Sequence, residues 1–144
     1  MKEYFVFNIK KEFANLYKDK QDELFYIFNR IYYMKEIDKG YGFNLFEQVC
    51  NFNDKDELND FIYDYYKDKV VYSKTSSNEH IINDLFLNEV SILTVKSSNI
   101  KIETNVENPS FFEHLKKYNK DLFVCDFKSQ NFFLLKRNRY TIKN

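Results

Sequence analysis

The first 30 residues change their hydrophobic period after Ile9, and this change constrains the fold more than any other feature of the chain. From Lys2 to Ile9, successive apolar side chains alternate between two sides, as they do in a β-strand. Phe13, Leu16 and Tyr17 then follow at the i, i+3 and i+4 spacing that places side chains on one face of a helix. The sequence therefore predicts a strand that leads almost directly into a short helix carrying two aromatic rings.

The apolar face of this short helix has two interpretations. Apolar stripes on helices usually face the interior, so the three side chains could belong to the core. Two aromatic rings on a short helix directly after a strand could instead form a rigid ridge that docks on another protein. The residues alone leave both interpretations open.

The composition limits both the core and the function. Aromatic residues make up 19% of the 144 residues, whereas the chain has two Gly and one Pro, so large rings fill most of the core and glycine-rich phosphate loops are excluded. Lys and Arg number 22, as do Asp and Glu, and the resulting zero net charge disfavours a protein that coats duplex nucleic acid. We expect one domain over residues 1–144. We also expect a cytoplasmic protein with no membrane partner, because no apolar run resembles a membrane span or a signal peptide.

Capping residues mark the expected helix starts in the first half of the chain. Asp19 is the predicted N-cap of a helix from about 21 to 34. A connector at 38–42, which holds both glycines, separates it from the next helix. Two later starts have Asn or Asp followed three residues on by Glu: Asn44 with Glu47, and Asp54 with Glu57. The helices that they open are expected to run through Cys50 and to near Asp68.

The second half of the chain reads mainly as hairpins. Two alternating runs, 89–96 and 99–105, flank Ser97-Ser98, and residues 122–127 and 131–136 form a second pair. Residues 70–72 suggest a short strand, residues 79–88 suggest a helix, and another short helix is expected to start at Asn108-Pro109. The sum predicts an α+β two-layer fold, with helices packed against a largely antiparallel sheet of about five strands. Arg137 to Asn144 is expected to form a frayed tail.

The sequence offers little catalytic or metal-binding chemistry. His80 and His114 have no second ligand at metal-binding spacing, so we expect no metal and no cofactor. Cys50 and Cys125 read as small core residues of a reduced protein, and Cys125 alternates in phase with other apolar residues of a strand. An enzyme is therefore not expected.

A basic segment near the C-terminus is the best candidate for contact with nucleic acid. Lys136 to Tyr140 combines positive charge with an aromatic ring, a pairing that binds single strands by charge and stacking. The balanced charge of the whole chain makes direct nucleic-acid binding the less favoured interpretation.

Two blocks of sequence resemble a known family. The first is IKKEFANLY at 9–17 with ELFYIF at 23–28, and the second is FFEHLKK at 111–117 with DFKS at 126–129. At this spacing they resemble the sporulation inhibitor of replication family, SirA. The blocks cover about a third of the chain, and residues 40–90 match only weakly.

The resemblance implies that the short first helix faces a partner. In the family this helix presents aromatic side chains to the N-terminal domain of DnaA, the bacterial replication initiator, and the matching positions here are Phe13 and Tyr17. A family glutamine also contributes, and Gln48 is the local counterpart. Polar side chains, Glu12 and Asn15 among them, would then surround the rings, and Leu16 would turn inward.

The mechanism that the resemblance implies is stoichiometric inhibition rather than turnover. Occupation of this DnaA domain would block DnaA self-association and the binding of helper proteins at the origin, as endospore formation begins. The alternative is a regulatory or nucleic-acid-associated α+β domain that acts through Lys136 to Tyr140.

Overall fold

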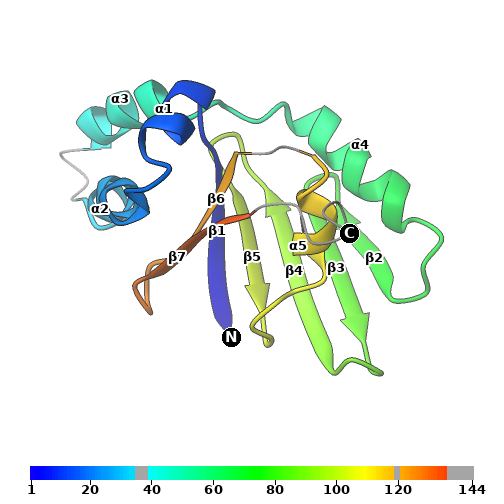
Figure 1. Ribbon diagram of the computed structural model, residues 1–144. Coiled ribbons are helices and arrows are strands. Elements are labelled where there is room, and N and C mark those ends of the chain that lie inside the picture. Colours follow the sequence, from blue (N-terminus) through cyan, green and yellow to red (C-terminus); the bar gives the residue numbers. More distant parts are fainter. Residues whose placement is uncertain (35–38, 119–120, 136–144) are drawn as a thin grey trace, which may run out of the picture.

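β1 (Lys2–Asn8) is a central strand with apolar side chains on both of its faces. It pairs antiparallel with β5 (Ile100–Thr104) on one side and with β6 (Leu122–Asp126) on the other. The structure is a computed structural model that describes residues 1–34, 39–118 and 121–135. The strand order in the sheet is β2-β3-β4-β5-β1-β6-β7, and every neighbouring pair is antiparallel (Figure 1).

The other elements follow in the order that Figure 1 shows. The remaining strands are β2 (Tyr72–Ser76), β3 (Glu79–Asp84), β4 (Glu89–Val95) and β7 (Asn131–Leu135). The helices in the described ranges are α1 (Lys11–Leu16), α2 (Gln21–Tyr32), α3 (Lys39–Val49), α4 (Lys55–Tyr66) and α5 (Phe111–Leu115). The predicted β4–β5 and β6–β7 hairpins, the predicted first strand and the helix from Gln21 are confirmed.

The α4 core covers one face of the sheet. It combines α4 and α5 with even-numbered residues of β1 and the side chains that face the same way from the neighbouring strands. Its fully buried members include Val6, Leu58, Ile62, Leu93, Ile102, Phe111, Leu115 and Val124. Burial against the sheet accounts for the helical spacing of Leu58, Ile62 and Tyr66 in α4.

The α2 core covers part of the opposite face and is mainly aromatic. Helices α1, α2 and α3 pack there on odd-numbered residues of β1 and β6. Its members are Phe7, Ile9, Leu24, Phe25, Phe28, Phe46, Val49, Cys50, Phe123, Cys125 and Phe127. Ring pairs such as Phe7 with Phe28, whose centroids lie 4.3 Å apart, fill this layer.

The expected α+β class and antiparallel sheet are confirmed, but two details are corrected. The sheet has seven strands rather than about five, and helices lie on both of its faces rather than in a single layer. The physical reason is that β1 and β6 alternate between two apolar faces. Each apolar face needs its own cover.

The segment 79–88 forms a strand and a turn instead of the predicted helix. β3 pairs with β4 over six residues, with His80 and Ile82 buried on one face. The remaining residues form a tight turn in which the Asp84 carboxylate accepts a hydrogen bond from Leu87 N and Asn88 has a φ of 53°. Tertiary pairing therefore outweighed the local apolar spacing. The predicted strand at 70–72 also lies later, because β2 begins at Tyr72.

Both glycines lie inside α3 rather than in a connector. The φ angles of Gly40 and Gly42 are negative. A Cβ on Gly42 would lie 2.9 Å from Met34 Sδ, so the missing side chain lets α3 approach the segment after α2. Asn44 consequently lies within the helix, and its predicted role at a helix start is wrong. Residue 38 of the predicted connector is outside the described residues.

The other helix starts agree only in part with the sequence. The Asp54 carboxylate accepts a hydrogen bond from Glu57 N at 3.1 Å, which confirms the predicted cap of α4. Lys20 rather than Asp19 is the N-cap residue of α2, and no side chain caps that helix. α5 starts later than expected, after Ser110, whose N and Oγ donate to the buried Glu89 carboxylate at 2.9 and 2.5 Å. The tail from Arg137 to Asn144 falls outside the described residues.

Candidate functional site

Helix α1 is a short element in which no residue is buried. Its first turn is closed by hydrogen bonds from Phe13 N and Ala14 N to Lys10 O, both at 2.9 Å. Lys10 N in turn donates to Val49 O at 2.9 Å, which ties the start of α1 to the end of α3. The helix is thus tied at its start and packed along one side rather than fully enclosed.

Phe13 and Tyr17 form a stacked pair along α1. Their ring centroids are 6.5 Å apart with an interplanar angle of 11°. Both side chains are half-buried and pack against the α2 core, so each has a portion that contacts the core and a portion that meets solvent. Packing against the core limits the motion of both rings before any partner arrives.

Leu16 points outward, contrary to the expectation that it turns inward. Its side chain is 63% exposed, whereas Phe13 and Ala14 of the same helix are half-buried. The inward position belongs to Ala14, which is half-buried and packs on the α2 core together with Phe13 and Tyr17. The small Ala14 side chain lets the helix sit close to the core, and Leu16 is left on the outer flank.

The polar residues that the family resemblance assigned to this surface are exposed. Glu12 and Asn15 both lie on α1 and face solvent. Gln48 is exposed near the end of α3, one residue before the carbonyl that binds Lys10 N. A second backbone hydrogen bond, from Asn51 N to Asn8 O at 2.8 Å, reinforces the same junction. The fold therefore brings the end of α3 to the start of α1, and Figure 1 shows the two helices side by side.

Two exposed apolar side chains in this part of the molecule are not predicted from the sequence. They are Phe43 of α3 and Phe52 beyond it, which are 52% and 43% exposed and have ring centroids 5.7 Å apart. Phe43 is hidden because the two glycines just before it favour a connector over a helix.

The thiols and imidazoles are separated by the sheet. Cys50 and Cys125 are buried in the α2 core, and this burial raises the pKa of both thiols, as expected for inert core residues. His80 and His114 lie on the α4 side, where burial lowers the pKa of His80 to about 4. Among the described residues, the two cysteines therefore lie on the opposite side of the sheet from the two histidines, and no Cys–His pair forms.

Other classes of site have no support in the described ranges. There, no three or more His, Cys, Asp or Glu side chains cluster in a way that could hold a metal ion. None of the helices that the structure describes has the length and hydropathy needed to cross a membrane. The basic segment from Lys136 to Tyr140 lies outside the described residues, so the nucleic-acid alternative stays a prediction.

Comparison with known proteins agrees with the two blocks quoted above. No curated protein matches the chain. The family model described as sporulation inhibitor of replication protein SirA matches residues 2–139. Because this match includes both blocks, the weakly matching middle and nearly all of the 144 residues, the chain belongs to the sporulation inhibitor of replication (SirA) family.

Proposed function

We propose that this protein inhibits the initiation of DNA replication by binding the N-terminal domain of DnaA through α1. The family is one of replication inhibitors that act in sporulation. The observation that carries the proposal is the exposed apolar surface of α1 and its C-cap residue. Leu16 is 63% exposed, and Phe13 and Tyr17 are only half-buried. An exposed apolar surface of this kind is typical of a contact site for another protein.

The rings of α1 are suited to act as anchors. Phe13 and Tyr17 are already stacked on each other and packed against the α2 core, so binding restricts few additional rotamers. Leu16 extends the apolar surface on the outer flank of the helix. Exposed Glu12 and Asn15 supply a polar rim, which is the usual surround of an aromatic hot spot.

Gln48 is proposed as a second part of the same contact surface. The Lys10 N to Val49 O hydrogen bond fixes the end of α3 against the start of α1. A partner lying along α1 would thereby meet the exposed Gln48 side chain without any rearrangement of the backbone.

The proposed mechanism is occupancy of a partner surface, with no chemical turnover. One copy of this protein would cover one DnaA N-terminal domain and block both its self-association and the binding of helper proteins at the origin. Because DnaA acts on the chromosome, the proposal places the protein in the cytoplasm during endospore formation.

Variants of α1 test this proposal by calorimetric titration with the DnaA N-terminal domain. We predict that Phe13→Ala and Tyr17→Ala each weaken binding by about 2 kcal/mol or more, which is roughly thirtyfold in Kd. Both rings also pack on the core, so thermal denaturation must show that each variant is folded at the titration temperature. Leu16→Ser tests the helix independently, because its exposed side chain contributes little to stability.

Phe86→Ala is the matched control. Phe86 is an aromatic residue that is 96% exposed in the β3–β4 turn, away from α1. This variant is expected to bind DnaA as the unmodified protein does. Unchanged affinity in all three α1 variants, or a loss of affinity in Phe86→Ala alone, would show that α1 is not the binding surface.

A further inference from the structure

The turn between β3 and β4 exposes three consecutive apolar side chains. Leu85, Phe86 and Leu87 are 90%, 96% and 57% exposed. The turn lies at the end of the sheet away from α1, as Figure 1 shows. Exposed apolar residues normally occur singly, so three in a row indicate a surface that contacts something other than water.

A second loop adds an apolar side chain beside this turn. Val70, in the loop between α4 and β2, is fully exposed. Asn83 N donates to Val71 O at 2.9 Å, so this loop lies against the end of β3, next to the turn. Val70 and residues 85–87 together form one surface, which we call the apolar tip.

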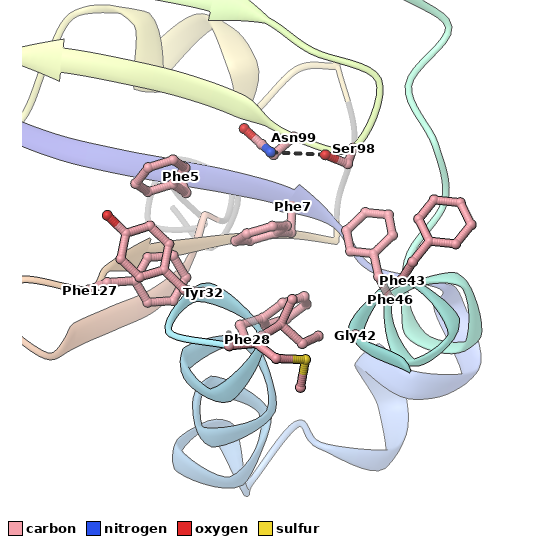
Figure 2. Close-up of a pocket in the computed structure, with 12 residues that line it drawn as sticks. Phe5, Phe7, Phe28, Tyr32, Gly42, Phe43, Phe46, Ser98, Asn99 and Phe127 are labelled. Carbon is pink, nitrogen blue, oxygen red and sulfur yellow. Dashed lines mark hydrogen bonds between the residues drawn. The ribbon is translucent and has the colours of Figure 1, made fainter. Parts of the chain in front are cut away.

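The apolar tip is convex. Side chains that are at least 90% exposed, such as Leu85 and Phe86, project from the surface rather than line a hollow. Figure 2 shows the hollow walled by rings of β1, α2 and α3, and neither that hollow nor the two hollows beside β7 includes a residue of the tip. A protein partner would need a pocket that encloses the tip from all sides, whereas a bilayer interface deforms around a projecting apolar turn.

The turn also satisfies its own backbone polar groups, as entry into an apolar environment requires. Leu87 N donates to the Asp84 carboxylate at 3.1 Å, and Asn88 N donates to Leu85 O at 3.3 Å. Asn88 O accepts a hydrogen bond from Asn105 Nδ2 at 3.0 Å. These bonds fix the backbone of the turn, so little ordering is needed when its side chains leave water.

The charges next to the apolar tip balance one another. Lys67, Asp68 and Lys69 precede Val70 and are exposed, and the half-buried Asp84 precedes the turn. Glu89, which follows the turn, is buried. Two lysines and two aspartates leave no net charge beside the tip, so apolar contact rather than attraction to an anion must hold any partner there.

We propose that the apolar tip inserts into the interface of a lipid bilayer and holds the protein on the membrane surface. The side chains of residues 85–87 enter the boundary between head groups and acyl chains, with Val70 beside them. We expected no membrane partner because no segment could span a bilayer, but contact with the surface requires no such segment. The inference goes beyond the proposed function, and α1 stays accessible because it lies at the opposite end of the sheet.

Sedimentation of the full chain with lipid vesicles measures this contact. The tip inserts less apolar surface than a myristoyl chain, which binds bilayers with a constant of about 10⁴ M⁻¹, so we expect about 10³ M⁻¹ on phosphatidylcholine vesicles. Because the neighbouring charges balance, the constant should change by less than about twofold when phosphatidylglycerol replaces part of the lipid or when salt is added.

A pair of matched variants tests the location. The double variant Leu85→Ser, Phe86→Ser should lower the binding constant at least tenfold, because it removes two inserted side chains. Leu16→Ser removes an exposed apolar side chain from α1 and should leave vesicle binding unchanged. The opposite pattern is expected in titrations with the DnaA N-terminal domain, so failure of one proposal is distinguishable from failure of the other.

Fluorescence tests insertion directly. The chain has no tryptophan, so a single one introduced at the tip reports its own surroundings. In Phe86→Trp, addition of vesicles should shift the emission to shorter wavelengths, and brominated lipid should quench it. Leu16→Trp, with the new ring at the opposite end of the sheet, should show neither effect.

Several outcomes overturn the inference. They are the absence of vesicle binding, undiminished binding in the double variant, and emission of Phe86→Trp that vesicles do not change. A shift in Phe86→Trp that grows with protein concentration without vesicles would show that a second copy covers the tip. Loss of DnaA affinity in the double variant, without vesicle binding by the unmodified chain, would assign the tip to a protein contact instead.

Discussion

His80 is fully buried between α4 and the sheet, where two side chains set its protonation. Asn59 Nδ2 donates to Asn78 Oδ1 at 2.9 Å, and His80 Nε2 donates to Asn59 Oδ1 at 2.8 Å. The neutral ring then accepts a hydrogen bond from the Tyr72 hydroxyl at Nδ1, at 2.7 Å. Burial lowers the pKa of His80 to about 4, so the folded protein holds this ring neutral.

The pH dependence of stability follows from the low pKa of His80. Below about pH 6.5 the unfolded chain binds a proton at this position, whereas the folded protein does not bind it until about pH 4. Stability should therefore fall as the pH drops through this window, by roughly 2 kcal/mol between pH 7 and pH 5. Urea denaturation at the two pH values measures the loss. His80→Asn should show a smaller loss than the unmodified protein, and an equal loss would contradict this role.

At the scale of single residues, the sequence identifies burial better than direction. Alternation in a strand was enough to place Cys125 in the core. For Leu16 the spacing showed only that it shares a helix face with Phe13 and Tyr17. Which edge of that face meets the core depends on how Ala14 fits against α2 and α3. Those contacts are tertiary, and the spacing of residues within α1 carries no information about them.

Single elements of the fold show where local signals decide the structure and where they do not. The cap of α4 was predictable, because Asp54 and Glu57 need only each other. The strand β3 was not, because apolar residues at 81, 82, 85 and 86 also fit a helix. Its identity comes from pairing with β4 and β2, and side-chain spacing within ten residues carries no information about those partners.

The two candidate caps provide a direct test at this scale. Asp54 accepts a hydrogen bond at the start of α4, whereas Asp19 precedes the N-cap residue of α2 and does not cap it. We predict that Asp54→Ala lowers the free energy of unfolding by about 1 kcal/mol. Asp19→Ala, which removes the same charge, should change it by less than about 0.5 kcal/mol. Equal effects of the two substitutions in urea denaturation would show that the hydrogen bond does not contribute.

The whole molecule is organised around β1, which supplies apolar side chains to both cores. We infer that the described residues form one domain, because β1, at the start of the chain, pairs with β5 and β6 from its second half and contributes to both cores. Its register also sets the position of the candidate surface. α1 follows the C-terminal end of β1. At the N-terminal end, Lys2 pairs with Thr104, Thr104 with Ser91, and Ser91 with Ile82. The β3–β4 turn, which follows Ile82, therefore lies at the opposite end of the sheet from α1.

The most direct test of the proposed function is a map of the complex on this chain. The isotope-labelled protein is titrated with the DnaA N-terminal domain, and backbone amide shifts are followed to saturation at one equivalent. We predict that the largest shifts fall in residues 11–18 and 48–51, with none in the turn at 85–88. Either the absence of a complex, or a complex whose shifts leave α1 unaffected and cluster elsewhere, would contradict the central claim that α1 is the surface that binds DnaA.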